Sequence, residues 1–343
     1  MDNSKVQHGQ FYTETNPFGH DAFFRWISLM KKYDKSAYES VWLEPWAGAN
    51  NIVEHMQDVQ VHNAIPAAWA CFDIDPETQD ENTSGVSVQT QDTIKNFPTG
   101  YTVNISNPPW LAKNSATEKK LSFPNTVYDD LYKVCLDLAL THNRWVALII
   151  PESFITQGLF HDRLITVISL TCKMFEATDV PACLALFVPI EVKQEHTDLK
   201  PLDFKVYIGK RYAGHFESLQ NKKPTANKHL PWKFNDTQGE IGLRALDNTE
   251  KASICFVTGQ SLVDVKITGS SRSITRISGV SKNIDLALLI KKANFILRLY
   301  RKTTKDILLT AFKGLRKDKK YRRRLDWQTA RDILDKAVEE MSA

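Results

Sequence analysis

The first 190 residues alternate between two hydrophobic patterns. Short apolar runs of strand length are separated by segments in which apolar residues recur every three or four positions, as in a helix. Continuous apolar runs at 145–151 and 183–188 are typical of strands buried on both faces, whereas 128–142 has helical spacing. Strands that alternate with helices predict an α/β fold, built on a Rossmann-like sheet with helices on both faces.

The pattern changes after Pro189, where residues 190–203 are polar and charged. We therefore place a domain boundary there, which divides the chain into domains 1–190 and 191–343. In the second domain, three alternating runs predict strands, at 204–208, 253–257 and 263–267. Two helical stripes predict helices, at 282–313 and 327–341. The expected C-terminal domain is therefore mixed α+β, with a basic helical part.

Composition narrows the class of protein. With 343 residues and 42% hydrophobic positions, the chain can bury a sizeable core and form a second domain. It has no signal peptide and no apolar run that could span a membrane, so we expect a cytoplasmic protein without a membrane partner. The histidines lack metal-ligand spacing, and no metal site is expected. The cysteines form no CxxC pair and mostly lie in apolar runs, which predicts buried thiols at Cys71, Cys135, Cys172, Cys183 and Cys255.

The most informative stretch follows an apolar, β-prone run at 101–106. It consists of Asn107, Pro108, Pro109 and Trp110. Because prolines fix φ and lack an N–H, the turn is rigid and presents carbonyls. The Asn107 amide oxygen and the Pro108 carbonyl can converge on one point, which suits an exocyclic amino group, and Trp110 offers a flat face to a base. Taken alone, the stretch is equally an ordinary loop after a strand.

A second turn lies upstream, between a buried strand that ends near Glu44 and a helix that begins near Ile52. Its small residues Ala47 and Gly48 allow a ligand to approach the backbone closely. Glu44 stands at the carboxyl end of the strand, where doubly wound sheets bind ligands. It could pair with a ligand ammonium group, or it could stabilise the helix N-terminus through the dipole.

Two further acids end predicted strands. Asp73 lies 29 residues after Glu44 (73 − 44), close to the spacing at which a Rossmann-type acid meets a ribose hydroxyl. Asp75 precedes a proline and is expected to shape the turn. Asp92 follows a strand-like run at 86–92. It could contact an adenine amino group or cap the segment that follows, and we give both interpretations equal weight.

Together these segments resemble the S-adenosylmethionine-dependent DNA amino-methyltransferases. Residues 44–48, 72–76, 92 and 107–110 are similar to motifs I to IV of that family, and 9–13 to its motif X, in the gamma order, over residues 8–190. Trp46 and Asn50 depart from motif I, where small residues are usual. The resemblance implies a class I methyltransferase sheet with S-adenosylmethionine as cofactor. The cofactor residues it implies are Phe11, Thr13, Glu44, Pro45, Ala47, Gly48, Asp73, Ile74, Asp92 and Asn107.

The same resemblance implies a reaction. Asn107, Pro108, Pro109 and Trp110 would be catalytic, and the product would be N6-methyladenine in duplex DNA. The target base would be flipped out of the helix and stacked on Trp110 and Phe175; a core aromatic is an equal alternative for Phe175. Two other functions stay open. One is methylation of RNA at adenine N6 or guanine N2, or of a protein glutamine. The other is a non-catalytic, nucleic-acid-binding relic of the fold.

Charge is unevenly distributed. The net charge is +4 (44 − 40), yet bases dominate from Lys291 until the final helix. We predict phosphate contacts with duplex DNA at Lys313, Arg316, Lys317, Lys319, Lys320, Arg322, Arg323 and Arg324. A second basic stretch at 221–229 could also touch DNA, and a solvated charged face is the alternative for both. The resemblance further suggests a nucleoid-associated enzyme of a bacterial or phage-infected cell, with a cognate restriction endonuclease as partner.

Overall fold

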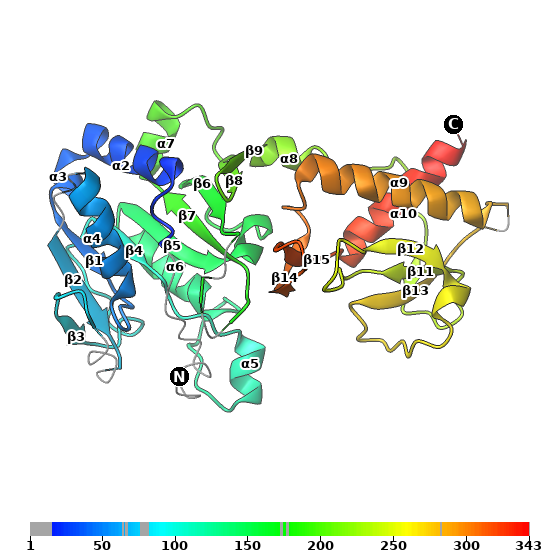
Figure 1. Ribbon diagram of the computed structural model, residues 1–343, viewed down its shortest axis with the longest axis horizontal. Helices are drawn as coiled ribbons and strands as arrows, with labels where there is room; N and C mark the ends of the chain where they lie inside the picture. Colours follow the sequence, from blue (N-terminus) through cyan, green and yellow to red (C-terminus); the bar gives the residue numbers. More distant parts are fainter. Residues whose placement is uncertain are drawn as a thin grey trace. The chain divides into compact units, whose positions relative to one another are not determined.

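The computed structural model describes residues 16–63, 65, 68–75, 82–171, 174–175, 178–281 and 283–342 (Figure 1). The chain forms two compact units, Met1–Tyr212 and Ala213–Ala343. The boundary thus lies beyond the one placed after residue 190. The reason is that β8 (Lys205–Ile208) pairs in parallel with β6 and so extends the sheet of the first unit past the polar segment.

The first unit is built on a nine-stranded sheet in the order β3-β2-β1-β4-β5-β7-β6-β8-β9. Strands β1 to β5 are mutually parallel, and β7 runs antiparallel to both β5 and β6. The order 3-2-1-4-5 is that of a Rossmann-like sheet, with its switch point between β1 and β4. The predicted Rossmann-like sheet is therefore confirmed. Its strands besides β8 are β1 (Val41–Glu44), β2 (Ala68–Asp73), β3 (Val88–Thr90), β4 (Val103–Ser106), β5 (Trp145–Pro151), β6 (Leu164–Ser169), β7 (Ala182–Phe187) and β9 (Arg211–His215).

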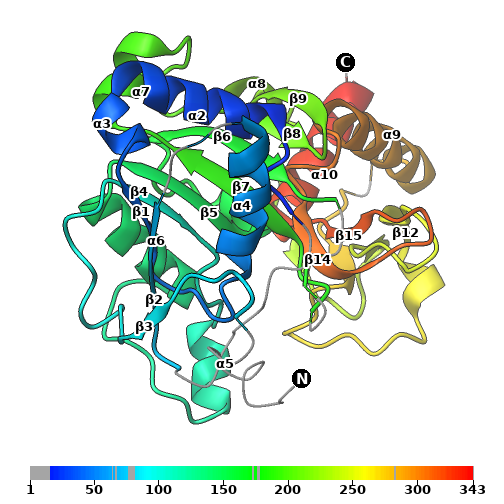
Figure 2. The same cartoon turned by 60° about the vertical axis from the view of Figure 1, so that its left-hand side comes forward.

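Helices cover both faces of this sheet (Figure 2). Cys71 and Phe72 are neighbours on β2, and their side chains point to opposite faces. Cys71 packs in a cluster with Val53 of α4, whereas Phe72 packs in a cluster with Leu138 of α6. The helices of this unit are α2 (Asp21–Tyr33), α3 (Lys35–Tyr38), α4 (Asn51–Asn63), α5 (Lys113–Glu118), α6 (Leu131–His142) and α7 (Ile190–His196).

Strands β5 and β7 in the middle of the sheet are apolar and buried. Every residue of β7 is buried, as are the first six of β5, in agreement with the continuous apolar runs of the sequence. β6 is equally buried, but the sequence pattern did not predict it because Thr166 and Ser169 interrupt its apolar run. Trp26 of α2 anchors its helix to the sheet: its indole N–H donates to the carbonyl of Phe187 at 2.8 Å.

The second unit contains a four-stranded antiparallel sheet in the order β10-β13-β11-β12. Its elements are α8 (Phe216–Gln220), β10 (Lys233–Phe234), β11 (Ile241–Arg244), β12 (Cys255–Thr258), β13 (Ile274–Ser278), α9 (Leu286–Thr304), β14 (Thr310–Leu315), β15 (Tyr321–Arg324) and α10 (Trp327–Ser342). Helix α9 contacts β12 and α10. Its N-terminus is capped by Asp285, whose carboxylate accepts from two backbone N–H groups.

Two sequence predictions in this unit are wrong. The helix expected over 282–313 ends at Thr304, because Lys305 and Asp306 adopt left-handed backbone conformations (φ 52° and 64°) that stop a helix. The chain then forms the hairpin β14–β15, so the basic segment is a β-ribbon rather than a helix. The strand expected at 263–267 is a turn that follows the short 3-10 helix η3 (Gly259–Leu262).

Four of the five cysteines that the sequence predicted to be buried lie within the described residues. Cys71, Cys135 and Cys183 are buried free thiols, and Cys255 is half-buried; Cys172 lies outside the described residues. Among the described residues, no group of three or more histidine, cysteine or acidic side chains could hold a metal ion. Over the same residues, no helix has both the length and the apolar character needed to cross a bilayer.

Candidate active site

The turn between β1 and α4 has two residues in the left-handed region, Gly48 (φ 51°) and Asn50 (φ 64°). Asparagine tolerates this region better than other side chains because its amide bonds locally. Here the Asn50 amide donates to the Ser84 hydroxyl at 2.8 Å and to the Val86 carbonyl at 3.2 Å. Asn50 therefore ties the turn to the segment before β3.

Asp73 at the end of β2 holds this turn. One carboxylate oxygen accepts from the Gly48 backbone N–H at 2.8 Å and the other from the Asp75 N–H at 2.9 Å. The side chain is largely buried, and burial raises the pKa of Asp73. Its oxygens retain further acceptor capacity, because an ionised carboxylate can accept about four hydrogen bonds. Asp73 also lines a pocket, as expected for a ligand-binding acid.

Glu44 lies beneath the turn and is completely buried. Its Oε1 accepts from the Trp46 backbone N–H at 3.1 Å and from the Ser106 hydroxyl. Burial raises the pKa of Glu44 to about 8, and the neighbouring Asp73 adds to the effect. Glu44 is not part of the pocket wall, so the structure gives it contacts with the chain and none with the pocket space.

The end of β3 contributes a third segment to the site. Asp92 accepts from the Lys95 backbone N–H at 3.2 Å and pairs with the Lys95 ammonium at 2.9 Å. Partial burial acts to raise the pKa of Asp92, but the hydrogen bonds and charge of Lys95 hold it below its ordinary value. Asp92 thus caps the turn after it and also lines the pocket, so the geometry accommodates both interpretations made from the sequence.

The turn after β4 forms the fourth side of the site. Asn107, Pro108 and Pro109 line the pocket. Trp110 is buried behind them and meets Phe175 at right angles, with ring centroids 5.0 Å apart and an interplanar angle of 89°. Phe175 is itself buried, so the two aromatics form one cluster next to the Asn107 turn instead of lining the pocket.

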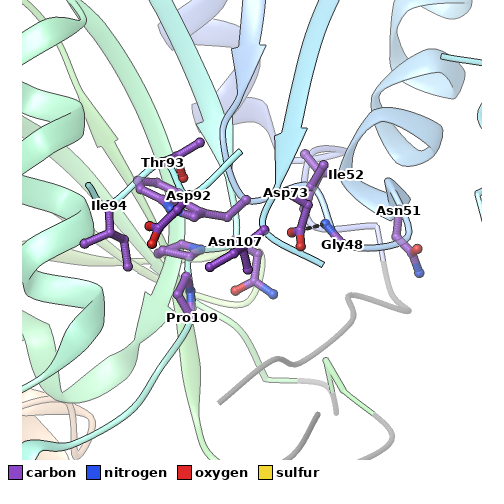
Figure 3. Close-up of a pocket in the computed structure, with 13 residues that line it drawn as sticks. Gly48, Asn51, Ile52, Asp73, Asp92, Thr93, Ile94, Asn107 and Pro109 are labelled. Carbon is purple, nitrogen blue, oxygen red and sulfur yellow. Dashed lines mark hydrogen bonds between the residues drawn. The ribbon is translucent and has the colours of Figure 1, made fainter. Parts of the chain in front are cut away.

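These four segments line one open pocket (Figure 3). In the close-up, the Asn107 amide lies between the carboxylates of Asp73 and Asp92. Eight of the predicted site residues line it, namely Ala47, Gly48, Asp73, Ile74, Asp92, Asn107, Pro108 and Pro109. Glu44, Pro45, Trp110 and Phe175 do not, and Phe11 and Thr13 lie outside the described residues.

The sequence did not identify five residues of the wall, which are Trp46, Asn51, Ile52, Thr93 and Ile94. Asn51 and Ile52 begin α4 directly after the turn, so their position in the first helical turn was an available signal. The Trp46 ring packs against Phe97, with ring centroids 6.0 Å apart, and against two buried clusters that contain Leu43 and Leu111. This packing accounts for a large residue in a turn where a small one is usual.

The residues that line the pocket suit a nucleoside-like ligand. It lies at the carboxyl ends of parallel strands and beside the switch point of the sheet, where such sheets bind ligands. The carboxylates of Asp73 and Asp92, which both line the pocket, can accept hydrogen bonds from hydroxyl or amino groups. The same wall contains the apolar side chains Ile52, Ile74 and Ile94, which can cover the faces of a flat ring.

The basic hairpin, residues 310–324, is the second candidate site. Asp247, fully buried, accepts two bonds from the Arg301 guanidinium at 2.9 Å each and one from Arg316 at 2.7 Å. Arg316 also pairs with Asp318, and Arg323 is buried with its backbone N–H directed to Asp247. The prediction of phosphate contacts is wrong for the Arg316 side chain, because its guanidinium is sequestered by two carboxylates.

The remaining bases of the hairpin are accessible. Lys313, Lys317, Lys319 and Lys320 are exposed, and Arg322 and Arg324 are half-buried. Lys317 pairs with Glu250 at 2.6 Å, although its side chain is 75% exposed. The Arg322 guanidinium lies over the Phe312 ring, 5.3 Å from its centroid. The hairpin is therefore a ribbon anchored by buried arginines that presents lysines to solvent.

A scan against protein-family models finds no match, and a search of curated proteins finds none either. Solved structures match in part. The methyltransferase subunit of a type I restriction-modification system from Streptococcus thermophilus is 13% identical, with a TM-score of 0.40 over 75% of this chain and 57% of that one. The M protein of the type I restriction enzyme EcoKI is 14% identical, with a TM-score of 0.35 over 92% and 71%. The type IIL restriction-modification enzyme MmeI, solved in complex with DNA, is 11% identical, with a TM-score of 0.39 over 97% and 58%.

The match therefore spans less than two thirds of the Streptococcus thermophilus subunit and of MmeI. All three are described as methyltransferase components or restriction-modification enzymes. At these TM-scores the likeness is partial, and the fold assignment of this chain stands on the strand order of its own sheet.

Proposed function

We propose that the chain is an S-adenosylmethionine-dependent DNA methyltransferase that modifies the N6 amino group of adenine in duplex DNA. One observation supports this activity above all: Asn107 and Pro108 stand in the same pocket wall as Asp73 and Asp92. The acceptors that would grip a target amino group thus adjoin the acids that would hold a nucleoside cofactor. A methyl donor and an acceptor nitrogen held in one pocket become effectively intramolecular reactants.

The residues of the pocket fit the proposed cofactor. Asp73 would accept from the ribose hydroxyls, and Asp92 would accept from the adenine amino group. Gly48 leaves room for close approach to the turn, because it has no side chain. Ile74 and Ile94 would cover the ring faces. When bound, S-adenosylmethionine supplies a methyl group that is already activated by its attachment to a positively charged sulfur.

The protein has to activate the acceptor nitrogen. The amino nitrogen of adenine is a poor nucleophile, because its lone pair is delocalised into the ring. The Asn107 side-chain oxygen and the Pro108 carbonyl would each accept one N–H of this group, which favours a more tetrahedral nitrogen with a directed lone pair. An aspartate could accept the same bonds, but a charge is costly to bury beside apolar rings. Pro109 stiffens the turn that aims both acceptors.

Access to this pocket requires base flipping, because an adenine inside a duplex cannot reach it. The sequence predicts that the flipped base stacks on Trp110 and Phe175; both rings are buried and neither lines the pocket, so this stacking stays a prediction. Duplex DNA is the proposed partner, held by the second unit through the exposed lysines of the basic hairpin. A cognate restriction endonuclease stays a prediction of the sequence resemblance.

The test is transfer of label from methyl-labelled S-adenosylmethionine to duplex DNA, followed by digestion and identification of the modified nucleoside. We expect N6-methyladenine. N4-methylcytosine, or label in RNA alone, would contradict the proposal; absence of S-adenosylmethionine uptake by calorimetry would indicate a non-catalytic relic.

Asn107→Ala should abolish transfer and leave cofactor affinity within about threefold, since its role is in the transition state. Asn63→Ala, an exposed asparagine at the far end of α4, is the matched control and should transfer normally.

A further inference from the structure

One buried carboxyl joins the two turns of the proposed active site. Glu44 Oε1 accepts from the Trp46 backbone N–H in the turn after β1 and from the Ser106 hydroxyl at the end of β4. Trp46 lines the pocket, and Ser106 immediately precedes Asn107, which also lines it. A single oxygen atom therefore fixes the backbone of the cofactor turn relative to the residue that begins the catalytic turn.

These two hydrogen bonds, which we call the Glu44 link, lie in the interior of the sheet. Glu44 and Ser106 are both essentially inaccessible to solvent, and they belong to adjacent parallel strands, β1 and β4. The second oxygen, Oε2, is buried and has no hydrogen-bond partner among the described residues. A buried, ionised carboxylate with an unsatisfied oxygen would be costly, whereas a carboxylic acid needs fewer partners.

We infer that Glu44 is a positioning residue, which sets the place of the Asn107 turn relative to the cofactor turn through Ser106 and Trp46. This inference rests on the proposed methyltransferase function and replaces the direct contact with a ligand ammonium expected from the sequence. Glu44 does not line the pocket, so we assign its effect to the two groups that donate to it. A displacement of about 1 Å between reacting groups can lower a rate about 100-fold, which gives such a link its importance.

The charge state of Glu44 makes the link sensitive to pH. The groups that face it are Asp73 and Cys71 on β2, the Ser106 hydroxyl on β4 and the Trp46 N–H. None of these is a cation. Because burial raises the pKa of Glu44 to about 8, the side chain is neutral at pH 7 and ionises above pH 8, where it introduces a second negative charge next to Asp73.

Four variants test the inference in the full-length protein. Glu44→Gln keeps an acceptor for both donors and cannot ionise, so its transfer rate at pH 7 should stay within about threefold of wild type. Glu44→Ala and Ser106→Ala remove the link and should lower kcat by about 10- to 100-fold, with S-adenosylmethionine affinity of Ser106→Ala within about threefold. Ser169→Ala, which removes another buried serine hydroxyl from the same sheet, is the matched control and should leave kcat unchanged.

The pH profile separates positioning from a merely structural role. Above pH 8 the wild-type rate should fall relative to that of Glu44→Gln, because only the wild-type side chain gains charge. Parallel profiles for the two proteins would overturn the inference, as would a Glu44→Gln protein as impaired as Glu44→Ala.

A measurement without methyl transfer keeps the inference distinct from the proposed function. The Trp46 amide should exchange with solvent deuterium about tenfold faster in Glu44→Ala than in wild type, and at the wild-type rate in Glu44→Gln. Lack of S-adenosylmethionine uptake by the wild-type protein would contradict the proposed function and leave this exchange pattern in place. Equal Trp46 exchange in all three proteins would overturn the link itself.

Discussion

The Asp73 carboxylate accepts a hydrogen bond from the Gly48 backbone N–H at 2.8 Å, although the two residues are 25 positions apart. Its other oxygen accepts from the Asp75 N–H at 2.9 Å. The end of β2 thus determines the shape of the turn after β1. Both oxygens face N–H donors, so an amide at this position cannot replace the carboxylate: whichever way it is turned, its NH₂ group meets a donor.

Asp73→Asn should therefore behave as a disruptive substitution. We expect it to lower the free energy of unfolding by about 1–3 kcal/mol, the usual cost of an unsatisfied buried donor, and to weaken S-adenosylmethionine binding at least tenfold. Denaturant titration and calorimetry measure the two effects. Asp58→Asn on the exposed face of α4 is the control. If Asp73→Asn had the same free energy of unfolding as wild type, the hydrogen bonds from the Gly48 and Asp75 N–H groups would not contribute to stability.

Gly48→Ala tests the backbone of the same turn. The φ of 51° at Gly48 lies in the left-handed region, where an alanine side chain costs about 1–2 kcal/mol. We expect a loss of that size in the free energy of unfolding, measured by urea titration, together with weaker cofactor binding. Gly269→Ala, at a glycine with open space around it and no positive φ, should be nearly neutral. A similar effect for both variants would contradict this account.

Asp247 should be the most sensitive carboxylate of the second unit. It is fully buried and neutralises Arg301 and Arg316. Asp247→Ala leaves two arginines without their shared partner, so we expect a loss of about 3–5 kcal/mol in the free energy of unfolding. Urea titration checks this value, with Asp264→Ala in an exposed turn as the control. A loss below 1 kcal/mol would mean that solvent replaces the ion pairs.

Binding of duplex DNA should depend on the exposed lysines of the basic hairpin. Serine substitutions at Lys319 and Lys320 should reduce the slope of log K against log salt concentration by about 0.9 for each phosphate contact removed. Fluorescence anisotropy at several salt concentrations measures this slope. Lys35→Ser, an exposed lysine of α3, is the control. An unchanged slope in the double variant would indicate that the hairpin is only a solvated charged face.

Glu44 should make the stability of the first unit pH-dependent. Its pKa is raised by burial from 4.5 to about 8, so the folded state holds a proton that the unfolded state releases above pH 4.5. The corresponding stabilisation is complete below pH 4.5 and is lost as pH rises through about 8. The free energy of unfolding of wild type should therefore decline between pH 5 and pH 8 relative to Glu44→Gln. Glu39→Gln, at an exposed glutamate, should leave the decline intact.

The sequence alone determined the first five strands of the sheet and the position of the pocket. Local patterns mark where the strands end: Glu44 and Asp73 end β1 and β2, Asn107 directly follows β4, and Asp92 lies two residues after β3. Because parallel strands bring their carboxyl ends to one edge, polar residues at those ends must gather there whatever the details of packing. Eight predicted residues accordingly line one pocket.

Only the tertiary structure decided which polar side chains face that pocket and which serve the fold. Glu44 meets Ser106 across 62 positions, and Arg316 meets Asp247 across 69. No local pattern encodes such pairs, so Glu44 resembled a ligand contact and Arg316 a phosphate contact. The same holds for the basic hairpin, where a helical stripe continues in the sequence past Thr304 but cross-strand pairing with 321–324 sets the conformation. The sequence shows which residues are charged. Whether a charged residue is buried depends on partners that only folding brings near.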